Sequence, residues 1–119
     1  MQLTDSQKEI LDYCVDDFTG LWLFVKVISR NLDIDEFDDL PEWIQPKVLD
    51  TIRSMLQLKL IEAGTIQKKK FVPFTNTVDE IITYIENEWN LLPRRPTLGD
   101  VCWFVSTPLG EQLAKDLNS

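Results

Sequence analysis

The chain has 119 residues, of which 44% are hydrophobic and 27% charged, and its formal net charge is −8. This length and balance predict one globular domain spanning residues 1–119 rather than a disordered chain. No apolar run reaches the roughly 18 residues needed to cross a bilayer, and the first residues lack the pattern of a secretion signal. We therefore expect a soluble cytoplasmic protein that does not bind membranes.

The sequence contains no histidine, and its two cysteines, Cys14 and Cys102, lie in apolar surroundings. Without histidine there is no Ser–His or Cys–His nucleophile pair and no His-ligated metal site. The four glycines are isolated from one another, so a phosphate-binding glycine loop is absent. We expect two buried thiols, no enzyme activity, no cofactor and no metal. Catalysis by paired carboxylates stays formally open, because sequence cannot place two carboxylates in one cleft.

Two helices are predicted at the start of the chain. Thr4 and Gln7 have the spacing of a capping box, which predicts a helix over residues 5–16. The next helix, over 19–31, is apolar nearly all round, so we expect it to be the central and most buried helix, with Trp22 in the core. The polar, acidic stretch 32–40 is predicted to be a loop.

A third helix is predicted to begin near Pro41, with a fresh start or bend at Pro46, and to run to about Leu60. Its apolar residues recur at helical spacing, and Gly64 is a plausible stop. The expected buried line is Leu49, Ile52, Leu56 and Leu60, with Val48 and Met55 beside it.

The pattern changes after Gly64. Short extended pieces over 65–67 and 71–74 flank three consecutive lysines. A helix over 78–90 follows, with a second capping-box pair in Thr77 and Glu80 and with Trp89 expected in the core. Residues 101–105 form a β-rich apolar run, and Thr107-Pro108 then opens a last helix with Leu109, Leu113 and Leu117 on one face.

Two stretches carry a resemblance to a known family. Leu56 to Gly64 (Leu-Gln-Leu-Lys-Leu-Ile-Glu-Ala-Gly) looks like the end of a third helix running into a first wing strand. Trp103 to Gly110 (Trp-Phe-Val-Ser-Thr-Pro-Leu-Gly) is similar to a returning wing strand and the cap of a last helix. With the order of the other elements, the chain resembles a winged helix-turn-helix domain.

This resemblance implies a mainly α fold with a small β-hairpin, a three-helix core and a C-terminal helix. The chain departs from the family because about 30 residues, including the helix at 78–90, separate the two wing strands. Either that helix is inserted between the wing strands, or the domain is a different helical fold with a small sheet. Fold analogy alone does not assign a function in either case.

The charge is distributed unevenly along the chain. Residues 1–50 hold 12 acidic and 4 basic residues, whereas residues 51–119 hold 8 of each. An EF-hand loop starting at Asp33 would need an oxygen ligand, a glycine and a glutamate where Phe37, Asp38 and Ile44 stand, so calcium binding is not expected. The acidic cluster is then either a solvated loop or a docking surface for a basic partner.

The first functional hypothesis is a non-catalytic protein-binding module. Its apolar anchors would be Phe37 and Trp43, although packing of Trp43 on the preceding helix is an alternative. Immunity proteins and antitoxins have this size and charge, and they inhibit basic partners by electrostatic steering. The predicted protein-binding residues are Asp33, Asp35, Glu36, Phe37, Asp38, Asp39 and Trp43.

The alternative is a winged-helix transcriptional regulator that binds DNA. Such regulators are commonly dimers, and the apolar helix at 78–90 would then supply a homodimer contact. The sequence pI of about 4.4 and a nearly neutral outer face on the third helix count against this alternative. Its DNA-contacting residues would be Lys47, Thr51, Arg53, Ser54 and Gln57 in the groove, with Lys68, Lys69, Lys70, Arg94 and Arg95 on the backbone.

Overall fold

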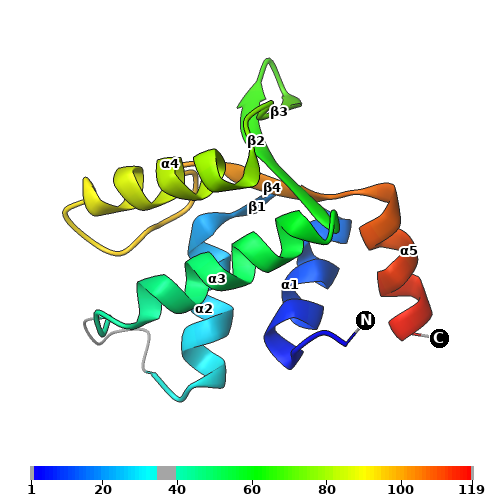
Figure 1. Cartoon of the computed structure of the whole chain (residues 1–119), viewed down its shortest axis with the longest axis horizontal. Helices are drawn as coiled ribbons and strands as arrows, with labels where there is room; N and C mark the ends of the chain where they lie inside the picture. The colour runs from blue at the N-terminus through cyan, green and yellow to red at the C-terminus, as the bar shows by residue number, and fades with distance from the viewer. Residues whose placement is uncertain (1, 35–39, 119) are drawn as a thin grey trace.

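The computed structural model describes residues 2–34 and 40–118, which form five helices and a four-stranded antiparallel sheet (Figure 1). The fold is therefore mixed, with helices predominating. In chain order the elements are α1 (Asp5–Asp16), β1 (Thr19–Gly20), α2 (Leu21–Asn31), α3 (Ile44–Gln57), β2 (Ile61–Gln67), β3 (Lys70–Pro73), α4 (Val78–Asn90), β4 (Trp103–Ser106) and α5 (Pro108–Leu117).

The sheet has the strand order β1-β4-β2-β3, so the last strand of the chain lies between two earlier ones. Within β4, Phe104 pairs with Thr19 of β1 on one side and with Ala63 of β2 on the other. The outer part of β2 pairs with β3 as a hairpin that projects from the top of the molecule in Figure 1. The pairing of β4 thereby links the α1–α2 junction to the segment that follows α3.

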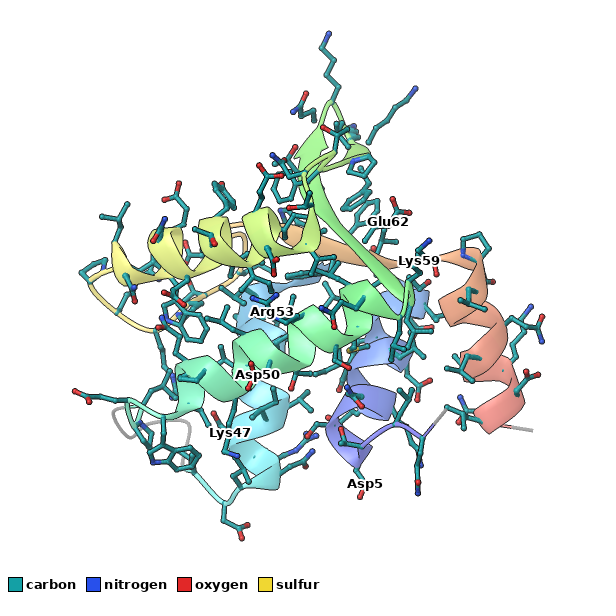
Figure 2. The ribbon with its side chains drawn as sticks, viewed as in Figure 1. Asp5, Lys47, Asp50, Arg53, Lys59 and Glu62 are labelled. Atoms are coloured by element: carbon teal, nitrogen blue, oxygen red, sulfur yellow. The ribbon has the colours of Figure 1, made fainter. Side chains whose placement is uncertain are left out.

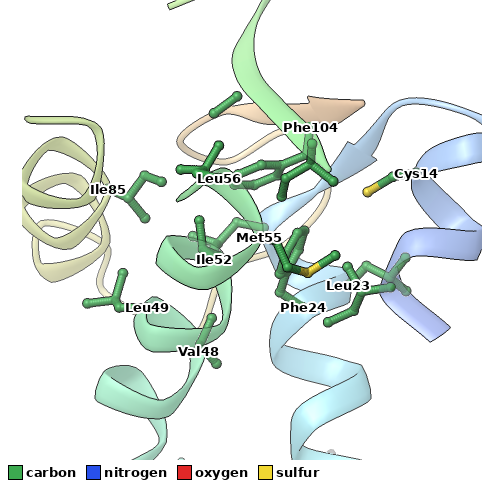
Figure 3. Close-up of a cluster of buried hydrophobic side chains, with 14 of the residues drawn as sticks. Cys14, Leu23, Phe24, Val48, Leu49, Ile52, Met55, Leu56, Ile85 and Phe104 are labelled. Atoms are coloured by element: carbon green, nitrogen blue, oxygen red, sulfur yellow. The ribbon is translucent and has the colours of Figure 1, made fainter. Parts of the chain in front are cut away.

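The core lies where the helices meet this sheet. Helix α2 packs between α1 and α3, while α4 lies beside α3 and α5 lies beside α1 (Figure 1). The rings of Phe24 and Phe104 have their centroids 4.5 Å apart, and Ile52, Met55 and Ile85 close around them without solvent exposure (Figure 3). One apolar cluster thus holds all the layers together.

Several sequence predictions are confirmed. Helices α1 and α4 have the predicted bounds, and both capping boxes form, at Thr4–Gln7 and Thr77–Glu80. The predicted buried line of the third helix is buried at every position, and Trp89 is in the core. The isoleucines of α4 are buried within the chain, and the predicted homodimer contact of this helix stays a prediction.

The bounds of the third helix were predicted incorrectly. It begins at Ile44 rather than near Pro41, and it ends at Gln57 rather than near Leu60. The end is set by Lys59, whose φ of 59° is left-handed, because the Lys59 N–H then donates to Leu56 and the Leu60 N–H to Met55, both at 3.0 Å. This is a Schellman motif with lysine where glycine is usual, so no residue type marked the helix end in advance.

Gly64 is not a helix stop but lies inside β2, directly opposite Pro73. A Cβ at this position would stand 2.2 Å from the Val72 carbonyl oxygen, so glycine permits the close approach of the two strands.

Three smaller expectations also differ. Residues 19–20 form strand β1, so α2 starts two residues later than predicted. Trp22 is only partly buried, because it packs at the edge of the core. On α5, Leu113 is partly buried, but Leu109 and Leu117 are exposed.

In the described part of the chain, none of the helices is long and apolar enough to span a bilayer.

The end of α3 and the start of α5 cap each other. The Thr107 hydroxyl donates to the Lys59 carbonyl at 2.6 Å, and the Thr107 N–H donates to the Leu60 carbonyl at 3.0 Å. Gly110 lies against the same carbonyl, since a Cβ there would stand 2.1 Å from the Leu60 oxygen. The contact therefore requires both a capping hydroxyl and a residue without a side chain.

We expect Gly110→Ala to lower the free energy of unfolding by about 2 kcal/mol, measured by urea titration. The clash with a backbone oxygen outweighs the roughly 1 kcal/mol that alanine gains over glycine as a helix former. Gln112→Ala, at an exposed position of α5, is the control and should change stability by less than about 0.5 kcal/mol. Unchanged or increased stability of Gly110→Ala would contradict the close packing of α5 on Leu60.

Candidate functional site

Trp43, which precedes α3, is 49% exposed, so about half of its surface is available to a partner. The ammonium of Lys47, one turn later in α3, lies 5.9 Å from the centroid of its ring. Leu32, at the end of α2, is 43% exposed on the same side of the chain. Lys47 and Leu32 line one shallow hollow, so Lys47 connects the two exposed apolar side chains.

This hollow has a volume of about 350 Å³ and lies where the start of α1, the end of α2 and the first turns of α3 converge. Most of its lining residues are polar, among them Asp50 and Thr51 from α3 and Thr4 from the α1 cap. Exposed apolar side chains beside polar groups are typical of protein–protein contacts. We call Leu32, Asp33, Trp43, Lys47, Asp50 and Thr51 the docking face.

Of the predicted acidic cluster, the structure places only Asp33. Asp35, Glu36, Phe37, Asp38 and Asp39 lie outside the described residues. Asp33 has a φ of 58°, and its N–H donates to the Arg30 carbonyl while the Ile34 N–H donates to Ser29. These two bonds form a Schellman motif, so Asp33 also ends α2, at a left-handed position that aspartate tolerates better than most residues.

The outward side of α3 carries both signs of charge (Figure 2). Lys47, Asp50 and Arg53 alternate along the helix, and Figure 2 shows them on one face with Asp5, Lys59 and Glu62 around them. Three cations and three carboxylates therefore share this face. A helix that enters the major groove of DNA is expected to present a surplus of positive charge.

The polar groups of α3 that were predicted to contact DNA are largely engaged within the chain. Arg53 forms an ion pair with Asp79 at the start of α4. The Thr51 hydroxyl donates to the Lys47 carbonyl, and the Ser54 hydroxyl accepts from the Gln7 amide at 3.2 Å. Gln57 is exposed at the end of the helix.

Helix α4 places further negative charge next to α3, because it lies beside α3 and has a carboxylate-rich outer surface. Asp79, Glu80 and Glu86 are exposed along it. Apart from Glu80, whose place in the capping box was predicted, these acidic residues were not expected to contribute to a site, since they do not belong to the densest acidic run. Their spacing in the sequence does predict that they are exposed, because it places them on the side of α4 away from its buried isoleucines.

The three lysines occupy the tip of the β2–β3 hairpin and are all exposed. Gln67 pairs with Lys70, so Lys68 and Lys69 form the two-residue turn, with φ of 51° and 67°. A turn with two left-handed residues is normally built from Asn-Gly or similar pairs, because a longer side chain is strained there. The hairpin tip is therefore a basic, backbone-strained projection.

Arg94 and Arg95 do not join that tip. They follow the far end of α4, a helix of 13 residues and hence about 20 Å long, whose beginning is next to the hairpin. Arg94 donates to Asp100 at 2.6 Å, and this bond, together with the Thr97 N–H at 2.7 Å, holds the pKa of Asp100 at about 2. The predicted DNA-contacting residues are thus dispersed over at least three places.

The remaining sequence predictions concern metal-ligating side chains and the two cysteines. Within residues 2–34 and 40–118, no three side chains among Cys, Asp and Glu are grouped so that they could hold a metal ion. Cys14 and Cys102 are free thiols, both buried as predicted. Burial raises the pKa of each to about 12, and at Cys14 a hydrogen bond with Thr19 offsets part of the rise. A thiol with such a pKa is not a nucleophile near neutral pH.

We expect neither thiol of the folded protein to react with a disulfide reagent such as dithionitrobenzoate in mildly alkaline buffer. Both should react at once when denaturant unfolds the chain, because the pKa then returns to its ordinary value. The absorbance of the released thiolate measures the reaction. Rapid release of one equivalent from the folded protein would contradict the burial of that cysteine.

Comparisons of the chain with protein-family models, with curated proteins and with solved structures gave no match.

Proposed function

We propose that this chain is a non-catalytic protein-binding module of winged-helix-related architecture, and that its docking face binds a protein with a basic surface. The order of elements supports the architecture. A short strand separates α1 from α2, β4 lies between β1 and β2, and α4 is inserted between β3 and β4. In this interpretation β2 and β4 are the two wing strands, and the β2–β3 hairpin with α4 extends the wing.

The observation that carries the functional proposal is the exposure of Trp43 beside a hollow. A half-exposed tryptophan is costly to leave in water, and tryptophan is enriched among residues that dominate binding energy. The hollow next to it provides a recess for a partner side chain. Lys47 lies over the ring and would be displaced or covered when a partner binds.

The sign of the partner's charge follows from the surroundings of Trp43. Glu42 precedes it, and Asp33 and Asp50 lie at the edge of the docking face; all three carboxylates are exposed. The whole chain carries a net charge of −8. A basic partner would be attracted over several ångströms, which raises the association rate and favours it over acidic competitors.

Affinity capture on the immobilised chain, from the cells that produce it, followed by titration of the purified partner, tests this proposal. We expect a partner with net positive charge whose affinity falls as salt is added. Trp43→Ala should weaken binding at least about 30-fold, the effect of losing roughly 2 kcal/mol at a central anchor. Tyr13→Ala is the matched control, because Tyr13 is 43% exposed but lies on α1 outside the docking face.

The proposal fails if the two variants weaken binding equally, or if the captured partner is acidic and binds more tightly at high salt. Thermal unfolding of both variants accompanies the titration. Removal of a side chain as exposed as Trp43 should leave stability nearly unchanged, so a loss of binding reports the contact itself.

The second candidate is DNA binding through the hairpin tip, and the strained lysine turn favours it. Lysines retained in left-handed conformations cost of order 1 kcal/mol each, and such strain often accompanies a functional site. The tip projects away from the carboxylates of α1, where it could contact phosphates (Figure 1). The neutral face of α3 supplies no sequence-reading surface to accompany it, so this candidate ranks second.

The double substitution Lys68→Asn with Lys69→Gly separates the two candidates. It removes two charges and supplies a favoured turn pair, so we expect stability to rise by about 1 kcal/mol. Fluorescence anisotropy of a labelled random duplex at low salt should show weak binding at most for the parent chain. Tight parental binding with a steep salt slope, reduced by about 2 in the variant, would instead establish the DNA candidate.

A further inference from the structure

A second cavity lies on a different side of α2 from the docking face. One wall is a stripe of α2 at helical spacing, formed by Trp22, Val25, Lys26 and Ser29. The opposite wall is the segment Arg95–Thr97, which follows α4. The cavity has a volume of about 490 Å³, within the range of sites that hold small molecules. It shares no residue with the docking face.

The described lining of this cavity is basic, whereas the chain as a whole is acidic. Lys26, Arg30 and Arg95 contribute to it, and none of the described lining residues is acidic. Arg30 forms an ion pair with Glu9 of α1, which fixes the guanidinium beside the cavity, while the Lys26 ammonium lies over the Trp22 ring. In a protein with 20 acidic and 12 basic residues, such a lining favours an anionic occupant.

The cavity also contains a buried polar group without a partner. Ser29 is 2% exposed, and its hydroxyl makes no hydrogen bond within the described part of the chain. Leaving a buried hydroxyl unsatisfied costs roughly 1–3 kcal/mol, so native structures rarely retain one without a reason. Ser29 belongs to the cavity lining but its hydroxyl oxygen is covered, so a small rotation of the side chain would let an oxygen of a bound molecule satisfy it.

The remaining lining includes apolar side chains from both walls. Val25 and Ile34 come from α2 and the turn that ends it, and Pro96, which is buried, faces them from the other wall. The Lys26 ammonium lies 5.6 Å from the centroid of the Trp22 ring, so cationic and aromatic groups meet at one end. This arrangement suits a molecule with a planar apolar body and one anionic group.

The wall at residues 95–97 is held in one conformation. The Asp100 carboxylate accepts from the Arg94 guanidinium, from the Thr97 N–H and from the Thr97 hydroxyl. Next to it, Val101 has a φ of 70° and the Cys102 N–H donates to the Asp100 carbonyl at 2.9 Å, which is a strained γ-turn for a β-branched residue. The cavity is therefore pre-formed, which lowers the entropic cost of binding.

We propose that this cavity binds a small organic anion that carries a flat apolar body, with the anionic group at Lys26 and the Ser29 hydroxyl. The probe pair 2-naphthoate and 2-naphthamide tests it, because the two molecules share one ring system and differ in charge. Titration followed by the indole signal of Trp22 in two-dimensional NMR should give saturable binding of naphthoate. Binding of naphthamide should be at least about tenfold weaker.

Three variants assign the interaction. Lys26→Gln removes the charge at an exposed position and should abolish the preference for naphthoate, whereas Lys115→Gln on α5 is the control and should retain it. Ser29→Ala removes the unsatisfied hydroxyl, so it should preserve or raise the unfolding temperature and yet weaken naphthoate binding.

The proposal is overturned if naphthoate does not saturate, if naphthamide binds as tightly, or if Lys26→Gln behaves like Lys115→Gln. Because Trp43→Ala leaves this cavity intact, naphthoate binding by that variant separates a failure here from a failure of the docking face.

Discussion

The pairing of β4 on both of its edges is the constraint on which the rest of the structure depends. Phe104 is held opposite Thr19 and opposite Ala63, and its ring packs on Phe24. The strand therefore fixes α2, which begins at the end of β1, relative to α3, which leads into β2. The docking face and the cavity both depend on this relative position of α2 and α3. The docking face lies where α2 and α3 meet, and the cavity lies between α2 and the segment that leads into β4. Neither surface would form from local sequence alone, because β4 is separated from α2 by more than 70 residues and must return to it through a long-range contact.

Local patterns in the sequence were sufficient for most helices but not for the bounds of the third. The capping boxes at Thr4 and Thr77 predicted α1 and α4 with their observed bounds, because a cap and an apolar stripe are both local signals. The end of α2 at Asn31 was also predicted correctly, whereas α3 ends in a Schellman motif with Lys59 in the left-handed position, where glycine was the expected marker. Strand β1 was missed for a related reason: two residues carry no period, and only pairing with β4 makes them a strand.

The candidate sites were harder to predict than the fold, because the sequence shows which residues are charged but not which of them form ion pairs. The exposure of Trp43 agrees with its selection as a candidate anchor, which stays a prediction, and the mixed charge on the outer face of α3 was expected from its sequence. The sequence could not show that Asp79 reaches Arg53, or that Asp100 holds Arg94, because each pair depends on how α4 and its following segment return to the domain. These pairs matter for function because they remove two cations from the set that could meet phosphate, which leaves the hairpin tip as the exposed basic cluster. The cavity was missed entirely, since its lysine and arginines are scattered along the sequence.

Helix α2 is apolar nearly all round, which predicted that it is buried on every side. In the structure its apolar residues serve two surfaces. Phe24, Val27 and Ile28 face the core, whereas Trp22 and Val25 form a wall of the cavity, so the helix is apolar around its circumference because two different surfaces require it. The turn at its end belongs to both candidate sites, since Leu32 lines the docking hollow and Ile34 lines the cavity. That turn is fixed by two backbone hydrogen bonds and a left-handed Asp33, and coupling between sites requires an element with two arrangements. The two surfaces therefore share α2 and the turn that ends it, while each has its own lining.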